Sequence, residues 1–367
     1  MNYMGQALSL ARLALGQASP NPAVGAVVVK EDAVIGQGYT QPPGSPHAEV
    51  LALKQAGEEA RGGVMYVTLE PCCHYGRTPP CTGAIVAASI SEVHMAMLDP
   101  NPLVSGRGKD ELEKEGIKVY LGERGEEAKE INEAYIKFIN TNLPFVTAKF
   151  AISLDGKIAT RNGDSRWISG REARKYVHNL RYTNDAIMAG VNTVLADDPH
   201  LTCRCSGGKG GTARKQPLRV IVDGKGRTPL TARVFGEPGK TLLALGRTVT
   251  PEEKAAFAQA GAEILELASA EGLVDLEGLL RALGERQITS VLVEGGGILF
   301  GSLFDRGLVD KVVAFIAPII IGGGEAKTAV AGKGVDKVAD SFRLERVRVK
   351  KLGDDLMVSG YVATEGE

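Results

Sequence analysis

The chain has 367 residues, of which 44% are hydrophobic and 24% are charged, and its formal net charge is −1. A chain of this length can form two or three domains, each burying its own apolar core. The balance of charges provides no broad positive field of the kind that binds nucleic acid or an anionic membrane surface. We therefore expect a small-molecule substrate, no nucleic-acid partner and no membrane partner.

The N-terminus has no basic segment followed by an apolar run, and no apolar stretch reaches the length that crosses a bilayer. We therefore expect a cytoplasmic protein. Five cysteines fall into two tight groups: Cys72, Cys73 and Cys81, then Cys203 and Cys205. A disulfide framework is not distributed in this way, so metal or catalytic roles are favoured. The second group has no partner pair nearby, and we expect no second metal site there.

Helical and strand patterns alternate through the first third of the chain. The periodicity of apolar residues predicts helices over 4–15, 48–60 and 83–89, and strands over 24–29, 34–39, 64–69, 93–98 and 119–121. This alternation predicts a three-layer α/β/α domain over residues 1–122. A charged helical stretch at 125–140 follows and runs into Asn-Thr-Asn-Leu-Pro, where the proline stops a helix. We assign residues 123–144 as a helical linker.

A second alternating series predicts an α/β domain over residues 145–367. Its strands are predicted over 145–152, 186–190, 219–222, 241–245, 290–293, 311–321, 342–350 and 356–362. The last two strands flank Gly-Asp-Asp and should form an antiparallel hairpin. Ser169 and Glu172 form an S-x-x-E capping box, which predicts a helix running to Arg181, and the pattern over 276–283 predicts another helix.

One group of residues has the composition of a catalytic zinc site. His47-Ala48-Glu49 is followed, after a predicted helix and strand, by Cys72 and Cys81. An imidazole and two thiolates suit Zn²⁺, and a catalytic zinc keeps one position for water, whose pKa the metal lowers to about 7. Glu49, two residues from a ligand, can then move protons between that water and a substrate nitrogen.

This pattern resembles the signature of the cytidine and deoxycytidylate deaminase superfamily, His-x-Glu followed by Pro-Cys-x-x-Cys. Here eight residues separate Cys72 from Cys81, where the signature has two. The longer loop, C-x-H-x-G-R-T-P-P-C after L-E-P, is similar to that of the pyrimidine deaminases of riboflavin biosynthesis. The resemblance implies a cytidine-deaminase-like fold, one Zn²⁺ per deaminase domain held by His47, Cys72 and Cys81, and Glu49 as the catalytic proton shuttle.

A structural zinc site is the alternative interpretation of the same residues. With Cys73 as a fourth ligand the site would be closed, and Glu49 would be an ordinary acid on a helix surface. We interpret Cys73 instead as a small buried residue without metal contact, and we treat His74 in the same way. Only the catalytic interpretation predicts deaminase activity.

Three residues are candidates for contact with the deaminase substrate. The resemblance implies that Asn21, in N-P-x-V-G, contacts the pyrimidine ring, and a turn asparagine before proline is the alternative. Arg77 has a permanent charge suited to a phosphate or carbonyl group, although exposed arginines are often only solvated. Asn101 lies in Asp-Pro-Asn-Pro, which either shapes the base pocket or forms a plain turn. Thr40 stands where many relatives carry histidine, so the contact made by that histidine is not predicted here.

The second half contains a glycine-rich segment but no Rossmann fingerprint. Gly295-Gly296-Gly297-Ile298-Leu299-Phe300-Gly301 has its last glycine one residue too late for G-x-G-x-x-G. The segment follows an apolar strand and leads into a helical stretch, so backbone N–H groups and a helix N-terminus could hold a cofactor phosphate. The alternative is a plain loop, because similar glycine clusters occur at 207–208 and 322–324.

Four segments of the second half resemble the NADPH-dependent reductases of the same pathway. They are A-I-S-L-D-G-K-I-A from Ala151, W-I-S from Trp167, V-L-A-D-D-P-x-L-T from Val194 and V-E-G-G from Val293. The resemblance implies a dihydrofolate-reductase-like α/β fold for this half. Deaminase and reductase together form the bifunctional proteins of riboflavin biosynthesis, a resemblance that spans nearly the whole chain in the expected order.

The resemblance also implies site residues for the reductase. Those expected to face NADPH are Ala151, Trp167, Ser169, Thr193, Asp197, Gly296, Gly297, Ile298, Leu299, Phe300, Gly301 and Ser302. Those expected to face the substrate are Ser165, Arg181, Leu201, Arg204 and Glu294. Arg181 and Arg204 suit phosphate oxygens, although a solvated helix face explains Arg181 equally well and Trp167 could be core packing. Lys149, flanked by apolar residues on a predicted strand, is a further candidate that could point into the site.

These observations predict a bifunctional enzyme of riboflavin biosynthesis. The first domain would deaminate 2,5-diamino-6-ribosylamino-4(3H)-pyrimidinone 5′-phosphate, and the second would use NADPH to reduce the ribosyl chain, giving 5-amino-6-ribitylamino-uracil 5′-phosphate. One alternative is a deaminase of a free base, nucleotide or tRNA beside a domain that only binds or dimerises. Another is a non-catalytic scaffold with structural zinc. We expect a homo-oligomer, either a dimer or a tetramer.

Overall fold

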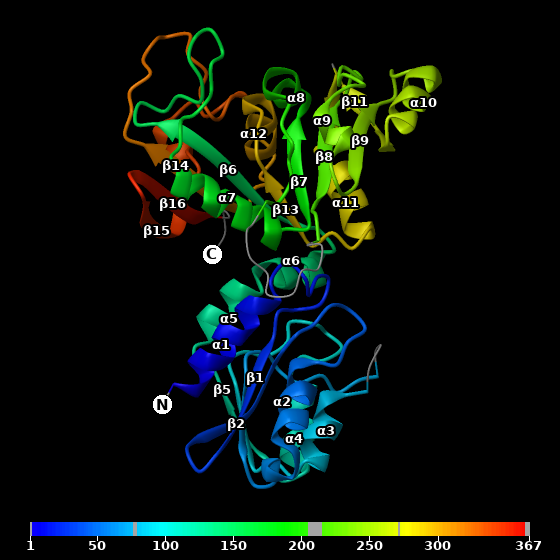
Figure 1. Ribbon diagram of the computed structural model, residues 1–367, viewed down its shortest axis with the longest axis vertical. Coiled ribbons are helices and arrows are strands. Elements are labelled where there is room, and N and C mark those ends of the chain that lie inside the picture. Colours follow the sequence, from blue (N-terminus) through cyan, green and yellow to red (C-terminus); the bar gives the residue numbers. More distant parts are fainter. Residues whose placement is uncertain (1, 76–78, 205–214, 271, 364–367) are drawn as a thin grey trace. The chain divides into compact units, whose positions relative to one another are not determined.

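The structure is a computed structural model that describes residues 2–75, 79–204, 215–270 and 272–363. It contains two compact units, unit 1 (Met1–Leu143) and unit 2 (Pro144–Glu367), each of which has its own sheet (Figure 1). Among the described residues, no helix is both long enough and apolar enough to cross a membrane.

Unit 1 is built on a five-stranded sheet with the strand order β2-β1-β3-β4-β5. Its strands are β1 (Gly25–Lys30), β2 (Ala33–Tyr39), β3 (Val64–Val67), β4 (Glu92–Met95) and β5 (Lys118–Leu121). β1 pairs antiparallel with β2 and β3, whereas β3, β4 and β5 are parallel. The carboxyl ends of β3 and β4 therefore lie at the same edge of the sheet, where the loops that follow them can form a site.

Helices cover both faces of this sheet. They are α1 (Tyr3–Ala14), α2 (Ala48–Ala56), the short 3₁₀ helix η1 (Gly57–Ala60), α3 (Cys81–Ala87), α4 (Arg107–Lys114), α5 (Gly125–Ile131) and α6 (Glu133–Thr141). α1 and α5 lie on one face, and α2, α3 and α4 lie on the other (Figure 1). The three-layer α/β/α fold expected for this part of the chain is confirmed.

Glycines allow the helices of unit 1 to approach the sheet closely. A Cβ atom at Gly25 in β1 would lie 2.0 Å from the carbonyl oxygen of Ala7 in α1. On the opposite face, Cβ atoms at Gly36 and Gly38 in β2 would lie 2.1 and 2.3 Å from carbonyl oxygens of α2. Backbone atoms cannot move aside as a flexible side chain can, so these three positions require glycine.

The stretch 125–140 was predicted as one helix, but it forms two helices that break at Asn132. The Asn132 side chain accepts a hydrogen bond from the Ala23 N–H at 2.8 Å and donates one to the Ala23 carbonyl at 3.1 Å. These bonds fasten Asn132, whose φ of −105° departs from the helical value, to the segment before β1. α4 was not predicted, because it buries only Gly108 and Leu112 and its apolar pattern is weak.

Unit 2 is built on a nine-stranded sheet with the strand order β10-β9-β8-β7-β13-β6-β14-β16-β15. Its strands are β6 (Phe145–Ser153), β7 (Ala186–Gly190), β8 (Leu218–Asp223), β9 (Thr241–Gly246), β10 (Ala262–Leu267), β13 (Ser290–Val293), β14 (Lys311–Ala317), β15 (Leu344–Leu352) and β16 (Asp355–Val362). A separate two-stranded ladder joins β11 (Ser269–Ala270) and β12 (Leu273–Val274).

The strands from β10 to β14 in this order are all parallel, and β16 and β15 continue the sheet as an antiparallel hairpin. The predicted terminal hairpin is therefore confirmed. β14 ends at Ala317, four residues before the predicted end, because Pro318 has no N–H to donate to a ladder.

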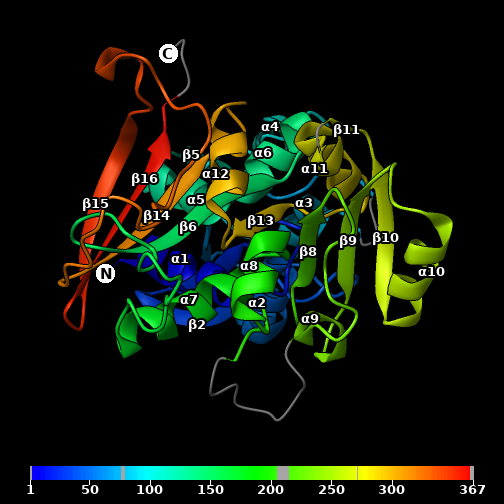
Figure 2. The same ribbon diagram turned by 90° about the horizontal axis from the view of Figure 1, so that it is seen from above.

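The helices of unit 2 lie on both sides of its sheet. They are α7 (Arg171–Thr183), α8 (Val191–Asp197), α9 (Arg233–Gly236), α10 (Pro251–Gln259), α11 (Leu276–Glu285), α12 (Gly297–Phe304) and the 3₁₀ helix η2 (Val338–Asp340). α7 and α9 lie on one side, and α11 and α12 lie on the other (Figure 2). α7 buries Ala173 and Val177 in a cluster with Phe315 of β14 and Met357 of β16. The α/β fold expected for this half is confirmed.

The capping box predicted at Ser169 is wrong. α7 begins after Gly170, which has no side-chain cap, and the Gly170 N–H donates to Asp355 Oδ2 at 2.7 Å. A carboxylate from a distant strand thus binds at this helix start. A capping box does form at α10, where Thr250 Oγ accepts from the Glu253 N–H at 3.2 Å and the Thr250 N–H donates to the Glu253 carboxylate at 2.9 Å.

We predict that Gly25→Ala destabilises unit 1 by about 1–3 kcal/mol, because the added methyl group meets the backbone of α1. Calorimetry of the full chain should show the unfolding transition of unit 1 lowered by about 3–10 °C. Gly83→Ala is the matched control, because a Cβ atom there has no neighbour within 4 Å and lies in α3. Equal transition temperatures for Gly25→Ala and the wild type would contradict the packing argument.

Candidate active sites

Three potential zinc ligands from separate elements converge in unit 1. His47 Nδ1 lies 3.2 Å from Cys81 Sγ and 3.6 Å from Cys72 Sγ, and all three ligand atoms lie within 4.8 Å of one another. Zn–N and Zn–S bonds of about 2.1 and 2.3 Å at tetrahedral angles separate two ligand atoms by about 3.5 Å. The group therefore fits one Zn²⁺ with a fourth position for water or substrate. Among the described residues, Cys73 does not belong to this group.

The local structure explains why these side chains meet. His47 is the N-cap residue of α2, Cys81 is the first residue of α3, and Cys72 follows β3. The sequence predicted a start of α3 two residues later, at Gly83, whereas the structure places Cys81 in the first turn. The Cys81 N–H also donates to Cys72 Sγ at 3.4 Å, which links the two cysteine segments directly.

The two cysteine side chains titrate as a pair. The hydrogen bond with Cys81, together with that of His47, outweighs burial and lowers the pKa of the Cys72 thiol to about 4. The hydrogen bond with Cys72 and burial both raise the pKa of the Cys81 thiol above its ordinary value. The hydrogen bond with Cys72 also raises the pKa of His47. One proton is thus held between the two sulfur atoms, and a divalent cation that binds there would displace it.

Glu49 lies in the first turn of α2 and is only 4% exposed. Its interpretation as an acid on a helix surface is therefore wrong. Burial raises the pKa of the Glu49 carboxyl group above its ordinary value, and the neighbouring Cys72 raises it further. A carboxyl group with a raised pKa beside a metal position is suited to take up a proton and return it.

A cavity of about 130 Å³ adjoins the ligand group and brings predicted substrate residues to it. Asn21 and Asn101 both line this cavity together with His47, Glu49 and Cys72. Asn21 comes from the segment before β1, and Asn101 comes from the loop after β4. Two segments that are 80 residues apart in the sequence therefore face the same small volume as the metal ligands.

Four other positions that the sequence analysis named have different outcomes. Thr40 lines the cavity, but its hydroxyl accepts a hydrogen bond from the Val24 N–H at 3.0 Å and thus fastens the start of β1. His74 also lines the cavity, and its Nδ1 is buried without a hydrogen-bond partner in the part of the chain that the structure describes. Arg77 lies outside the described residues, as does Cys205 of the second cysteine group.

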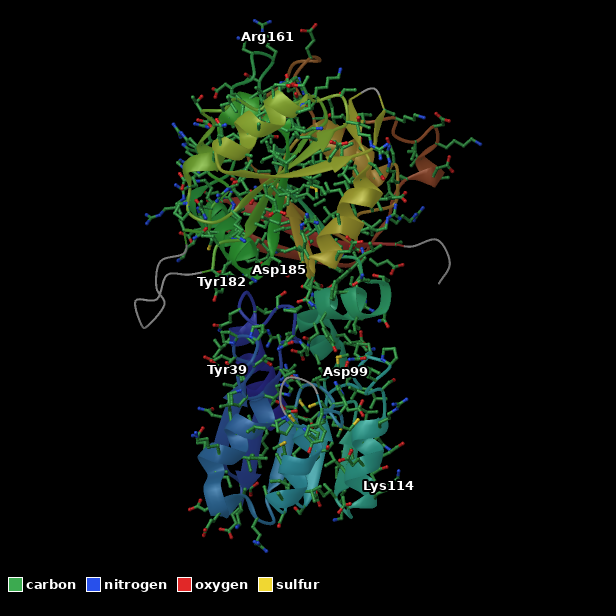
Figure 3. All side chains as sticks on the ribbon, turned by 90° about the vertical axis from the view of Figure 1, so that its right-hand side faces the viewer. Tyr39, Asp99, Lys114, Arg161, Tyr182 and Asp185 are labelled. Carbon is green, nitrogen blue, oxygen red and sulfur yellow. The ribbon has the colours of Figure 1, made fainter. Side chains whose placement is uncertain are left out.

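The buried acid Glu70 shapes this cavity and was not predicted. Its carboxylate accepts backbone hydrogen bonds at 3.1, 2.9 and 3.0 Å from Asp99, Gly106 and Lys109. These bonds hold the loop that carries Asn101 against the end of β3. Asp99 (Figure 3) accepts a further bond from the Tyr135 hydroxyl at 3.0 Å, and burial raises the pKa of the Asp99 carboxyl group. The available signal was an acidic residue directly after a buried strand, in L-E-P.

In unit 2, a cavity of about 590 Å³ gathers the residues predicted to face the reductase substrate. All six line it, namely Lys149, Ser165, Arg181, Leu201, Arg204 and Glu294. Five residues predicted to face the cofactor line the same cavity, namely Ala151, Trp167, Ser169, Thr193 and Asp197. Six cationic side chains and three carboxylates line this substrate cavity, so its charge favours a phosphorylated ligand.

Glu294, directly after β13, is the centre of a buried charge cluster in the substrate cavity. Its carboxylate accepts hydrogen bonds from Arg181 at 2.5 and 2.9 Å and lies 3.8 Å from Lys149 Nζ. Burial alone would raise the pKa of Glu294, but the charge of Arg181 outweighs burial and lowers it. Burial lowers the pKa of Lys149, and Glu294 offsets part of this effect. The Arg181 side chain is 13% exposed, so its interpretation as part of a solvated helix face is wrong.

Trp167 and Ser165 lie at the same cavity. Trp167 is 71% exposed, and the Arg174 guanidinium lies 4.6 Å from its ring centroid. Its alternative interpretation as core packing is therefore wrong. Ser165 Oγ donates to Asp197 Oδ1 at 3.0 Å, so a predicted substrate residue and a predicted cofactor residue are linked directly.

The glycine-rich segment is divided between two environments. Four of its residues line a second cavity of about 390 Å³, namely Gly296, Ile298, Leu299 and Ser302. The other three predicted residues line neither of these cavities, namely Gly297, Phe300 and Gly301. Phe300 packs against Phe150 with ring centroids 5.8 Å apart, and a Cβ atom at Gly301 would lie 2.1 Å from the Ala331 carbonyl oxygen. These positions therefore serve the packing of α12.

Comparison with known families matches both units in order. The model of the cytidine and deoxycytidylate deaminase zinc-binding region matches residues 1–97, and the RibD C-terminal domain matches residues 144–358. The fold and the two sites thus define a bifunctional enzyme, a zinc-binding deaminase joined to a reductase.

Relatives match nearly the whole chain. The riboflavin biosynthesis protein RibD of Aquifex aeolicus is 43% identical, covering 97% of both chains, and that of Escherichia coli is 39% identical, covering 96% of this chain and 97% of its own. The solved structure of Acinetobacter baumannii RibD, form 1, has a TM-score of 0.87 at 38% identity and covers 99% of this chain and 98% of its own. The chain belongs to the RibD family of bifunctional deaminase–reductases of riboflavin biosynthesis. The binding-only second domain and the non-catalytic scaffold are thereby excluded.

We predict that the wild-type protein binds about one zinc ion per chain and that His47→Ala, Cys72→Ala and Cys81→Ala each lose it, because three ligands form the group. Cys73→Ala is the control and should keep its zinc. Elemental analysis after exhaustive dialysis measures the zinc content per chain. Loss of zinc from Cys73→Ala would show a site closed by four ligands.

Proposed function

We propose that unit 1 deaminates 2,5-diamino-6-ribosylamino-4(3H)-pyrimidinone 5′-phosphate and that unit 2 then reduces the ribosyl chain with NADPH, giving 5-amino-6-ribitylamino-uracil 5′-phosphate. The proposal rests on one observation, a His/Cys/Cys group beside a buried carboxylate in the same chain as a cation-rich cavity around Glu294. A similar structure from Thermotoga maritima, 36% identical with a TM-score of 0.85, covers 98% of both chains. It is described as a diaminohydroxyphosphoribosylaminopyrimidine deaminase and 5-amino-6-(5-phosphoribosylamino)uracil reductase.

In unit 1, His47, Cys72 and Cys81 would hold one Zn²⁺, which when bound lowers the pKa of a water molecule and activates it for attack on a ring carbon. Glu49 takes the proton from that water, because its burial gives the carboxyl group a raised pKa and it lines the same cavity. Glu49 would pass that proton to the ring nitrogen, and would then carry the second proton of the same water, from the hydroxyl group now attached to the ring carbon, to the departing amine. The carboxyl group is thus the proposed catalytic residue of the deamination.

In unit 1, the side chains proposed to bind the substrate can both donate and accept hydrogen bonds. Asn21 and Asn101 carry amide groups of this kind and line the cavity. They suit the edge of a pyrimidine ring, which presents both hydrogen-bond donors and acceptors. Asn101 is held in place because its loop is bonded to Glu70. Arg77 is proposed as a contact to the phosphate or a carbonyl group of the substrate, on its charge alone.

In unit 2, the substrate cavity would bind the phosphorylated sugar. Arg181 and Arg204 supply forked donors for phosphate oxygens, and Glu294 holds Arg181 in a fixed orientation. Ser165, Leu201 and Lys149 complete the proposed substrate contacts.

NADPH would supply the hydride when bound. The residues proposed to face it in the substrate cavity are Ala151, Trp167, Ser169, Thr193 and Asp197. The segment 296–302 continues the proposed cofactor site into the second cavity, where four of its residues line the wall. The role of unit 2 is thus to align the nicotinamide with the sugar carbon.

A homo-oligomer, dimer or tetramer, and a cytoplasmic location are further parts of the proposal. β15 supports the assembly, because it is the edge strand of the nine-stranded sheet and its central residues are exposed on both faces. An exposed edge of this length is a template for pairing with another strand.

We predict that Glu49→Gln keeps its zinc but releases ammonia about 10²–10⁴-fold more slowly from the diamino substrate, because the amide cannot carry a proton. Glu58→Gln on the exposed 3₁₀ helix η1 is the control and should release ammonia at the wild-type rate. Ammonia release is followed by a coupled assay. Full activity of zinc-loaded Glu49→Gln would contradict the proposed role.

We predict that Glu294→Gln loses the reductase activity by at least about 10²-fold and destabilises unit 2 by about 3–5 kcal/mol, because Arg181 and Lys149 lose their buried partner. NADPH oxidation is measured at 340 nm with the deaminated phosphorylated intermediate. Deaminase activity of the same preparation is the internal control and should be unchanged. A wild-type protein that deaminates but never consumes NADPH would end the reductase proposal.

A further inference from the structure

The stretch that the sequence pattern assigns to a linker, residues 123–144, also contributes to the site of unit 1. Tyr135, in the first turn of α6, lines the cavity of about 130 Å³ together with Asn21 and Asn101. We refer to this volume below as the deaminase cavity. Two side chains at the start of α6 form hydrogen bonds to segments that line it, and these segments are distant from α6 in the sequence.

The first of these side chains is Asn132, which binds the segment before β1. It is buried, accepts a hydrogen bond from the Ala23 N–H at 2.8 Å and donates one to the Ala23 carbonyl at 3.1 Å. A further bond to the Ala128 carbonyl at 3.3 Å fastens the same amide to α5. Pro22, which precedes Ala23, has a fixed φ. Holding Ala23 therefore also restricts Asn21, the residue on the other side of the proline.

The second side chain is Tyr135, which binds the loop after β4. Its hydroxyl donates to Asp99 Oδ1 at 3.0 Å, and the same oxygen accepts the Asn101 N–H at 2.9 Å (Figure 3). Asp99 is buried, so water does not readily replace a bond that is lost there. The Tyr135 ring packs against the core of unit 1, which fixes the position of its hydroxyl. Asp99 thus connects Asn101 to the core through the tyrosine.

These contacts are separate from those that hold the metal ligands. His47 and Cys81 lie at the starts of α2 and α3, whereas Asn132 and Tyr135 lie at the start of α6. Glu70 holds the backbone of the loop after β4, and Tyr135 holds the Asp99 side chain. The start of α6 can therefore affect the two substrate-binding segments without moving the metal ligands.

We propose that Asn132 and Tyr135 are positioning residues of the deaminase, which hold Asn21 and Asn101 in place for the pyrimidine ring. Asn132 acts through the backbone of Ala23, and Tyr135 acts through Asp99. This inference rests on the proposed substrate of unit 1. Loss of either contact loosens one wall of the deaminase cavity, so it weakens substrate binding and spares the zinc site and proton transfer by Glu49.

Tyr135→Phe removes the hydroxyl and keeps the ring that packs against the core. Its KM for the diamino substrate should rise several-fold to about 10-fold, while kcat for ammonia release changes by less than about 2-fold, because substrate and transition state lose the same binding contact. Its zinc content should equal that of the wild type. Tyr120→Phe is the matched control, because Tyr120 is exposed on β5 and does not line the deaminase cavity. A wild-type KM for Tyr135→Phe, or a loss confined to kcat, would overturn the inference.

The Asp99→Ala variant distinguishes action through Asp99 from direct contact between the tyrosine and the substrate. In this variant the hydroxyl of Tyr135 has lost its partner, so adding Tyr135→Phe should change KM by less than about 2-fold. If the two substitutions instead raise KM by factors that multiply, Tyr135 contacts the substrate itself and its positioning role is wrong.

Hydrogen exchange of the substrate-free full chain, measured by mass spectrometry, tests the positioning without catalysis. Asn132→Ala should accelerate exchange around Ala23 and leave the loop after β4 unchanged, whereas Tyr135→Phe should accelerate exchange around Asn101 and leave Ala23 unchanged. Tyr135→Phe keeps its packed ring, so its result does not depend on the stability of Asn132→Ala. Wild-type exchange at Asn101 in Tyr135→Phe would overturn the inference. A wild type that releases no ammonia from the diamino substrate would refute the proposed substrate alone, because the exchange pattern still decides whether the two residues hold the cavity walls.

Discussion

Parallel pairing of strands is the constraint on which both sites depend. Because parallel strands bring their carboxyl ends to one edge, the residues that follow each strand meet there even when they are distant in sequence. In unit 1, Cys72 follows β3 and Asn101 comes from the loop after β4. In unit 2, Glu294 follows β13, and Lys225 and Arg227 lie in the loop that follows β8. Each unit thus places reactive groups on loops and helix starts at the edge of its sheet, while the sheet supplies the rigid support.

Buried charge is matched by specific partners in both units, as its desolvation requires. Glu70 is matched by backbone N–H groups, which makes it a clamp for a loop. Glu294 is matched by Arg181 and Lys149, which lowers the pKa of its carboxyl group. Among the described residues, no lysine or arginine lines the cavity of Glu49, and burial raises the pKa of its carboxyl group. This contrast explains why Glu49, and neither of the other two acids, is suited to proton transfer.

The glycines of the chain have different structural roles, which the number of glycines in the sequence does not reveal. Gly25, Gly36 and Gly38 allow helices to touch the sheet of unit 1, and Gly301 allows a loop to touch α12. Gly226 supplies a left-handed backbone between two cations. Gly296, in the segment predicted to bind a cofactor phosphate, lines the cavity of about 390 Å³ in unit 2, as do Gly190, Gly224 and Gly272. Replacing glycine with a larger residue would therefore lower the stability at most of these positions and weaken binding at only a few of them.

Residue type and spacing predicted that His47, Cys72 and Cys81 would lie together, and the structure brings them together beside Glu49. The patterns also predicted the order of two α/β domains. Metal chemistry accepts few side chains, and strand and helix periods are local properties of a segment. Three features could be seen only in the folded structure: the break at Asn132, the start of α7 at Gly170 and the clamp at Glu70. Each depends on a hydrogen bond to a residue between 29 and 185 positions away, which no local pattern encodes. The cavity of about 390 Å³ in unit 2 also depends on the fold, because Arg227 and Arg306 line one volume only after the sheet is assembled.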